Sequence, residues 1–189
     1  MTKKEKLVKA FFFDLDGTLC DTDRANYIAY KEACKKEGYI LEEEDFYRVN
    51  GNRADKFIPM LFPEITKKQV DNIRQNKALI YPGLLHETRP NTELIDFLKI
   101  MKPHHKLVLV TTAARKNAEH ILRHTGLEDS FDQMIFGEDI INPKPAPDVY
   151  LYALKETELS ADEVVAFEDS VVGIEAATSA GIKTVRVKI

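Results

Sequence analysis

The pattern of apolar and polar positions predicts five short strands separated by amphipathic helices. Each predicted strand is a mostly apolar run between polar or turn-forming residues, which is typical of parallel strands buried on both faces. The runs are Leu7–Phe13, Lys106–Val110, Gln133–Phe136, Val164–Phe167 and Thr184–Val187. The helices predicted around the last four runs are Asn91–Met101, Arg115–Thr125, Ala146–Glu156 and Val171–Ala180. Strands that alternate with helices predict a doubly wound α/β fold with a five-stranded parallel sheet.

The interval between the first and second predicted strands breaks this alternation, because it contains helical signals only. The helices predicted there are Asp23–Glu37, Glu42–Val49, Arg53–Leu61 and Thr66–Tyr81. Thr66 and Gln69 have the spacing of a capping box, which marks the start of the last of them. A crossover between strands does not need a connection of this length. We therefore predict that residues 21–88 form an inserted helical domain and that residues 1–20 and 89–189 form the α/β core.

The first predicted strand ends at two carboxylates, Asp14 and Asp16, followed by Gly17 and Thr18. Side chains two positions apart in an extended chain point the same way, so we expect the two carboxylates to converge. Two anions at the end of a buried strand repel each other and lose hydration, which is costly unless a cation lies between them. Oxygen ligands favour a hard divalent cation, so the pair predicts a Mg²⁺ site. An ordinary acidic turn is the alternative explanation of this segment alone.

Polar side chains also follow the other predicted strands. Thr111 and Thr112 follow the second strand, a loop with Lys144 between prolines follows the third, and Glu168 and Asp169 follow the fourth. In an open α/β sheet, ligands bind beyond the carboxyl ends of the strands. Each residue taken singly has a structural explanation, such as a strand end, a rigid loop or a helix cap. Together they favour phosphoryl chemistry, in which a carboxylate attacks phosphorus while a metal, a lysine and hydroxyl groups neutralise its oxygens.

Composition and charge narrow the class of protein. An apolar share of 44% suits a globular protein with a real core, and a net charge of −4 does not indicate a nucleic-acid partner. No apolar run approaches the roughly 20 residues that span a bilayer. The two cysteines, Cys20 and Cys34, fit no zinc pattern; a disulfide is possible, but a reducing compartment is favoured. The first residues lack the layout of a secretory leader, so we expect a cytoplasmic protein.

Four segments resemble, in order, the four motifs of the haloacid dehalogenase-like superfamily. They are Asp14–Thr18, Thr111, Lys144–Pro145 and Glu168–Gly173. The predicted insertion lies where that family has its C1 helical cap. The segment Gly173–Gly181 resembles the subgroup that contains β-phosphoglucomutase and phosphoglycolate phosphatase-like enzymes. The resemblance covers nearly the whole chain.

The resemblance implies a role for each acidic residue. Asp14 would be the nucleophile, and Asp16 would be the general acid/base that protonates the leaving oxygen and later activates water. Mg²⁺ would be bound by Asp14, by the backbone carbonyl of Asp16 and by Asp169. Glu168 would be a further metal ligand or an acid just behind the ligands. Thr111 and Lys144 would hold the phosphoryl group, and the adjoining Thr112 is a candidate for the same role.

These assignments favour a Mg²⁺-dependent phosphatase that acts on a small phosphorylated metabolite through an aspartyl-phosphate. A sugar-phosphate mutase of the β-phosphoglucomutase type is the first alternative. It is weakened because Asn26 stands where those mutases carry a histidine, and an amide cannot shuttle a proton. A non-catalytic binding protein on the same fold is the second. Within the insertion, Arg53 follows Asn50–Asn52 and is a candidate substrate contact, although it could simply start a helix.

Overall fold

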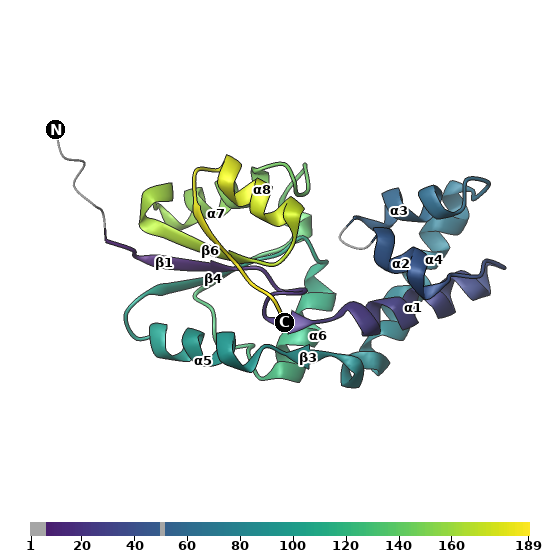
Figure 1. The fold of residues 1–189 in the computed structure, drawn as a ribbon, viewed down its shortest axis with the longest axis horizontal. Coiled ribbons are helices and arrows are strands. Elements are labelled where there is room, and N and C mark those ends of the chain that lie inside the picture. Colours follow the sequence, from purple (N-terminus) through teal and green to yellow (C-terminus); the bar gives the residue numbers. More distant parts are fainter. Residues whose placement is uncertain (1–6, 50–51) are drawn as a thin grey trace. The chain divides into compact units, whose positions relative to one another are not determined.

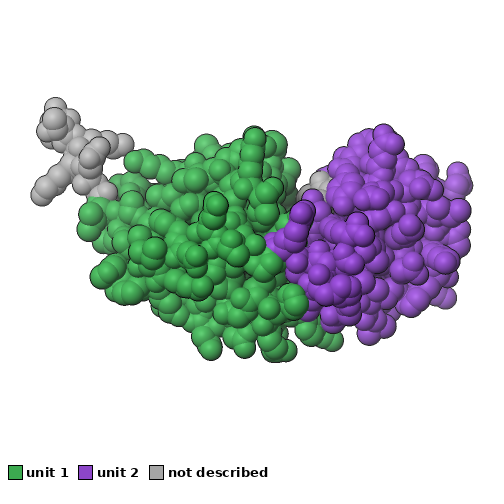
Figure 2. Space-filling view, turned by 60° about the horizontal axis from the view of Figure 1, so that its bottom comes forward, with its two compact units in different colours: residues 1–21, 90–189 green, residues 22–89 purple. Residues whose placement is uncertain are grey.

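The computed structural model describes residues 7–49 and 52–189. The chain divides into two compact units, which Figures 1 and 2 show in ribbon and space-filling form. Residues 1–21 and 90–189 form one unit, called the core unit here, and residues 22–89 form the other, called the helical unit. The chain therefore leaves the core unit after Asp21 and re-enters it at Pro90.

The core unit is built on a five-stranded parallel sheet with the strand order β5-β4-β1-β6-β7. The strands are β1 (Ala10–Phe13), β4 (Lys106–Val110), β5 (Gln133–Ile135), β6 (Val164–Glu168) and β7 (Lys183–Arg186). The predicted α/β class and the five strands are confirmed, with small shifts at their ends. The first strand begins at Ala10 rather than Leu7, whose side chain is exposed. Strand β1 lies at the centre of the sheet, which explains why all its residues are buried.

Four helices cover the two faces of the sheet, with α7 and α8 on one face and α5 and α6 on the other (Figure 1). They are α5 (Thr92–Met101), α6 (Arg115–Thr125), α7 (Asp148–Thr157) and α8 (Val171–Ser179). The three phenylalanines of β1 alternate between the faces. Phe12 belongs to the apolar cluster that includes residues of α7 and α8. Phe11 packs on the other side against Phe97 of α5, with ring centroids 5.3 Å apart.

Helix α7 begins two residues later than the sequence pattern predicts. The pattern placed its start at Ala146, whereas the structure has Pro147 in the N-cap position and Asp148 as the first helical residue. A residue that precedes proline is disfavoured in helical conformation, which keeps Ala146 out of the helix. The loop that carries Lys144 is correspondingly longer than expected.

A second sheet, with two short strands, was not predicted. It pairs β2 (Cys20–Asp21) with β3 (Arg89–Pro90). Strands of two residues are too short to show any periodicity in the sequence. Cys20 and Cys34 are buried thiols rather than a disulfide.

The helical unit contains the four predicted helices and a 3₁₀-helix. They are α1 (Asp23–Lys36), α2 (Glu43–Val49), α3 (Ala54–Leu61), α4 (Lys67–Ile80) and η1 (Tyr81–Glu87). Its own apolar core includes Tyr27, Phe46, Phe57 and Ile73. The predicted capping box at the start of α4 is present, with Thr66 as the N-cap residue. None of the helices in residues 7–49 and 52–189 is long and apolar enough to cross a membrane.

Candidate active site

The carboxyl edge of the sheet brings acidic residues from β1 and β6 side by side. These strands are neighbours, and Phe13 is in register with Phe167. The residues that follow, Asp14 and Glu168, are therefore adjacent, and the Asp14 amide donates to the Phe167 carbonyl at 3.1 Å. Both side chains are buried, with 7% of Asp14 and none of Glu168 exposed. The parallel register thus places two buried carboxylates next to each other.

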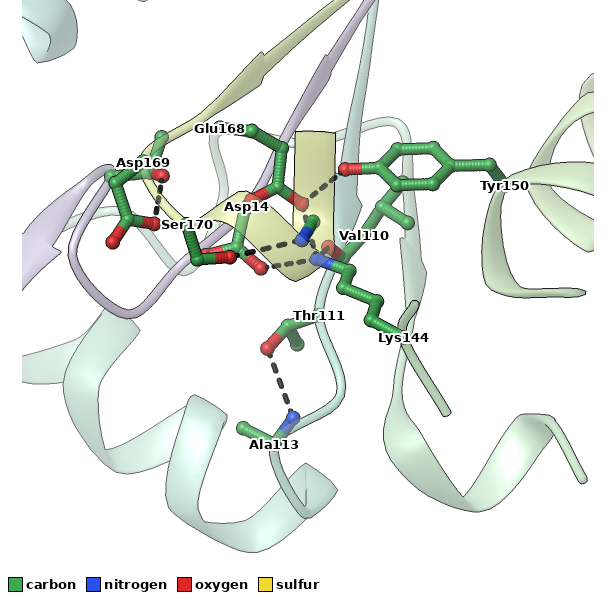
Figure 3. A network of polar contacts seen from close by, with 11 residues as sticks. Asp14, Val110, Thr111, Ala113, Lys144, Tyr150, Glu168, Asp169 and Ser170 are labelled. Carbon is green, nitrogen blue, oxygen red and sulfur yellow. Dashed lines mark hydrogen bonds and ion pairs between the residues drawn. The ribbon is translucent and has the colours of Figure 1, made fainter. Parts of the chain in front are cut away.

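Lys144 joins these two carboxylates (Figure 3). Its Nζ donates to Asp14 Oδ1 at 2.6 Å and to Glu168 Oε1 at 2.5 Å. A longer contact of 3.4 Å reaches the carbonyl of Val110, at the end of β4. Only 6% of the Lys144 side chain is exposed. The lysine therefore lies in the interior and is not part of a solvated loop.

Tyr150, on α7, also donates to Glu168. Its hydroxyl lies 2.5 Å from Oε1, the same oxygen that Lys144 contacts, as Figure 3 shows. The other oxygen, Oε2, is buried and accepts no hydrogen bond from any residue that the structure describes. Glu168 therefore has one oxygen with two donors and one with none.

The electrostatics of the site are dominated by negative charge. Burial, followed by the nearby Glu168 carboxylate, raises the pKa of Asp14 well above its usual range, although Lys144 opposes this. Burial also raises the pKa of Asp169. For Lys144, burial lowers the pKa, but Asp14 and the other negative groups around it outweigh burial and raise the pKa well above its usual value. Lys144 is therefore held in its charged form. Its single positive charge is smaller than the combined negative charge of the ionised carboxylates around it.

A divalent cation would fit this arrangement. Asp14, Glu168 and Asp169 each offer one carboxylate oxygen, and these oxygens lie within 4.8 Å of one another. Buried anions at that spacing are costly without a compensating cation. The oxygen Oε2 of Glu168, buried without a donor, is a further sign that the protein alone does not satisfy the site. An all-oxygen donor set is the kind that Mg²⁺ prefers.

Asp169 is held by the turn that follows β1. Thr18 Oγ1 donates to Asp169 Oδ1 at 3.0 Å. Gly17 has a φ of +82° and packs against the same carboxylate, because a Cβ at this position would lie 3.1 Å from Oδ1 and closer still to Oδ2. A side chain at position 17 would therefore be strained by the backbone and would displace Asp169. Ser170 is the N-cap of α8 and accepts from Gly173, so the cap that was considered for Glu168 and Asp169 belongs to Ser170.

The threonines of the second strand end lie on the same edge of the sheet. Thr111 follows β4, the other neighbour of β1, and only 1% of it is exposed. Its Oγ1 accepts from the Ala113 amide at 3.0 Å, which leaves the hydroxyl proton available for an acceptor. Gly137 also contacts this loop, because its amide donates to the Ala113 carbonyl at 3.0 Å. A Cβ on Gly137 would collide with the carbonyl of Thr112.

Asp16 and Arg53 are predicted site residues that lie outside the carboxylate cluster of the described residues. Asp16 lies in the turn after β1, where its backbone pairs with Cys20. Its side chain does not belong to the carboxylate cluster found among the described residues. Arg53 is the N-cap residue of α3 in the helical unit, where its Nε donates to Asp55 Oδ1 at 2.9 Å. Asn50 and Gly51, the start of the loop proposed around Arg53, lie outside the described residues.

The comparison with known families decides the class of protein. The sequence profile of the haloacid dehalogenase-like hydrolases matches residues 11–187, which is nearly the whole chain. This chain belongs to the haloacid dehalogenase-like hydrolase family. The resemblance seen in the four sequence motifs is confirmed.

Among curated proteins, a phosphorylated carbohydrates phosphatase of Thermotoga maritima is 33% identical over 183 residues, covering 94% of this chain and 84% of the relative. A fructose-1-phosphate phosphatase of Escherichia coli is 27% identical, covering 94% of this chain and 95% of the relative. The structure of CbbY from Rhodobacter sphaeroides in complex with phosphate has a TM-score of 0.88 and 24% identity, covering 97% of this chain and 87% of that one. The last comparison confirms the fold.

The sequence motifs that mark the haloacid dehalogenase-like family did not reveal two features of the site. Tyr150 was assigned only to the helix after Lys144, although a tyrosine on a buried helix face needs a partner for its hydroxyl. Gly173 was part of the last motif but had no role. A Cβ on Gly173 would lie 2.5 Å from Glu168 Oε1 and closer still to Oε2, so this glycine makes room for the carboxylate.

Proposed function

We propose that the protein is a Mg²⁺-dependent phosphatase that hydrolyses a small phosphorylated metabolite, a phosphorylated sugar in particular, through an aspartyl-phosphate. The observation that carries this proposal is the buried contact between Asp14 and Lys144 within a cluster of three carboxylates. A strand-end carboxylate beside a buried cation suits attack on a phosphoryl group. Two curated relatives that are named as phosphatases of phosphorylated sugars support the substrate class.

In the proposed first step, an oxygen of Asp14 attacks phosphorus and forms a P–O bond to the enzyme. The bond between phosphorus and the ester oxygen of the substrate breaks, and its electron pair stays on that oxygen. Asp16, in its protonated form, gives its proton to the leaving oxygen, so that an alcohol departs. The products of this step are the free alcohol, the aspartyl-phosphate and an ionised Asp16.

In the proposed second step, water attacks the phosphorus of the aspartyl-phosphate. Asp16, now ionised, accepts the proton of the attacking water, and the bond between phosphorus and Asp14 breaks. Inorganic phosphate leaves, Asp14 is restored as a carboxylate, and Asp16 is again protonated. The two steps therefore consume one water and return every residue to its starting form.

The remaining residues are proposed to hold the phosphoryl group and the metal. Lys144 would contact the phosphoryl oxygens while it holds Asp14, and the Thr111 hydroxyl and Thr112 would bind the same oxygens. Asp14, Asp169 and the Asp16 carbonyl would hold Mg²⁺, with Glu168 as a ligand or directly behind the ligands. When bound, Mg²⁺ supplies positive charge that offsets the phosphoryl oxygens and draws them toward the nucleophile.

We further propose that residues 21–88 act as a cap that selects the substrate. In this proposal, Arg53 binds a second anionic group of the substrate. The mutase alternative is disfavoured at Asn26, whose Nδ2 donates to Thr22 Oγ1 at 3.1 Å. An amide in this position cannot exchange a proton with a sugar hydroxyl. The non-catalytic alternative is disfavoured because a scaffold has no need of two buried carboxylates beside a third that is partly buried.

The proposal is tested by incubating the purified protein with a panel of phosphorylated sugars, nucleotides and short acids in the presence of Mg²⁺. We expect release of inorganic phosphate, without an isomer of the substrate, and loss of activity in excess chelator. Asp14→Asn should abolish turnover because the amide is nearly isosteric but a poor nucleophile. An isomeric product would favour the mutase, and absence of turnover across the whole panel would favour the binding protein.

A further inference from the structure

We propose that Tyr150 is a positioning residue that fixes the rotation of the Glu168 carboxylate, so that Oε1 faces Lys144 and Oε2 is left for a divalent cation. This inference rests on the proposed function, because it concerns the metal site of the same reaction. It assigns a role to a residue on α7, outside the four motifs on which the family assignment rests.

The hydrogen bonds around Glu168 carry the proposal (Figure 3). The Tyr150 hydroxyl and the Lys144 Nζ both donate to Oε1, each at 2.5 Å. A carboxylate oxygen has two lone pairs, so these two donors satisfy Oε1. No donor among residues 7–49 and 52–189 reaches Oε2, although it is buried. The Glu168 carboxylate is therefore satisfied at one oxygen only. Glu168 is also a member of the carboxylate cluster with Asp14 and Asp169, so a cation bound there could take up the unsatisfied oxygen.

Lys144 alone would not fix this orientation. Its Nζ also donates to Asp14, so one ammonium group serves two carboxylates. A terminal carboxylate torsion is broad, and one donor shared between two anions defines it poorly. A tyrosine hydroxyl adds a neutral donor at the end of a rigid ring. It strengthens the hold on Oε1 without drawing Lys144 away from Asp14.

The backbone around Tyr150 is suited to this purpose. Tyr150 is fully buried, and its amide donates to the Pro147 carbonyl at 3.0 Å in the first turn of α7. Before the helix, Asn142 Nδ2 donates to Asp148 Oδ1 at 2.8 Å, which closes the loop that carries Lys144. The Lys144 Nζ lies 5.3 Å from the centre of the Tyr150 ring. The loop before α7 therefore supplies Lys144, and the first turn of α7 supplies Tyr150, as the two donors to Glu168 Oε1.

The test compares Tyr150→Phe, which removes only the hydroxyl, with Tyr152→Phe on the same helix. Tyr152 is partly buried against the core, and its hydroxyl makes no hydrogen bond to the network around Glu168. The melting temperature of each protein is measured against Mg²⁺ concentration without substrate, and kcat and KM are measured with a phosphoester. We expect Tyr150→Phe to raise the Mg²⁺ midpoint by about 10- to 100-fold, as for other residues that orient metal ligands. We expect kcat to fall with KM unchanged, and Tyr152→Phe to match the wild type.

The outcomes separate the inference from the proposed function. If the wild type responds to Mg²⁺ and turns over, and Tyr150→Phe has the same Mg²⁺ midpoint and kcat, the positioning role is wrong even if the melting temperature has dropped. If the melting temperature of the wild type does not respond to Mg²⁺ and the wild type hydrolyses no phosphoester, the proposed function is wrong, and this inference is then wrong as well.

A measurement on the wild type serves if Tyr150→Phe does not fold. With tyrosines labelled at the ring carbon that bears the hydroxyl, the Tyr150 resonance should shift on addition of Mg²⁺, because Glu168 would then share its charge with the metal. The Tyr152 resonance should stay in place. A Tyr150 resonance that is unmoved by saturating Mg²⁺ would refute the inference.

Discussion

Gly173→Ala sets two physical effects against each other. In α8 the glycine has an ordinary helical position, and alanine is favoured over glycine in helices by about 0.5–1 kcal/mol. Helix propensity alone therefore predicts a more stable protein. The structure predicts the opposite, because the added Cβ would lie 2.5 Å from Glu168 Oε1 and nearer to Oε2, and real Cβ atoms essentially never come within 3.0 Å.

The size of the effect follows from what holds Glu168. Its side chain has no exposed surface, so the carboxylate cannot swing into solvent. Making room for a methyl group would break or stretch its hydrogen bonds from Lys144 and Tyr150. Each hydrogen bond to a charged group contributes about 1.5–3 kcal/mol. After the gain in propensity is subtracted, we expect the free energy of unfolding to fall by about 2–5 kcal/mol.

Urea denaturation of the variant gives this free energy, and Gly83→Ala is a matched control. Gly83 lies in η1, and a Cβ there would meet no atom within 4 Å. Its substitution should leave stability nearly unchanged. The same Gly173→Ala change in a Glu168→Ala background should become neutral or stabilising by about 0.5–1 kcal/mol, because the clashing group is gone and only helix propensity remains.

The change in the free energy of unfolding caused by Gly173→Ala, measured in the wild type and in Glu168→Ala, tests whether the methyl group collides with Glu168. A Gly173→Ala protein as stable as the wild type would show that Glu168 can move at little cost. Equal destabilisation with and without the Glu168 side chain would show that the methyl group collides with something else. In the proposed enzyme, kcat for phosphoester hydrolysis should fall together with stability, since the displaced carboxylate belongs to the metal site.

Four further predictions concern charges and the metal. Lys144→Ala should cost about 3–5 kcal/mol of stability by leaving two buried carboxylates without their cation, and should impair turnover more than Lys144→Arg. Ca²⁺ should inhibit the Mg²⁺-supported reaction, because its longer bonds and larger ligand number would misalign the nucleophile; equal rates with both ions would contradict this. The pKa of Glu163 is lowered to about 2, mainly by its contact with Lys9. The stability that this residue contributes should be complete above its ordinary pKa of 4.5 and lost as pH falls toward 2, so urea midpoints of Glu163→Gln and the wild type should converge there. Arg53→Ala should raise KM for an anionic sugar phosphate but hardly change that for a small generic phosphoester, whereas Arg48→Ala, which removes a similar exposed ion pair, should change neither.

Much of the fold follows from the sequence because the signals are strong and local. The apolar run around Phe12 is typical of a buried parallel strand. The carboxyl ends of parallel strands meet at one edge of the sheet. Those two facts are enough to predict that Asp14, Glu168 and Lys144 lie close together, although their chemical roles stay predictions. The strands β2 and β3 could not be predicted, because two residues are too few to show an alternation of apolar and polar positions.

The finer geometry of the site could not be predicted for a different reason. Nothing in the sequence says which oxygen of Glu168 Lys144 would contact, or that a tyrosine from the next helix would share it. A tyrosine at a core position in a helical pattern is indistinguishable from one that only fills space. The sequence pattern also placed the start of α7 two residues too early, at Ala146 rather than Asp148.

The raised pKa values of Asp14 and Asp169 connect the fold with the proposed chemistry. Burial and mutual repulsion favour the protonated forms of these carboxylates more than water does. A protonated Asp14 could not attack phosphorus, so burial at the sheet edge disfavours the ionised form of Asp14 that the reaction needs. Lys144 offsets part of this effect, and a divalent cation bound by the same cluster would offset the rest. In the proposed enzyme, a bound metal would therefore favour the ionised form of the nucleophile in addition to binding the phosphoryl oxygens, so the three carboxylates and the metal would act as one electrostatic unit.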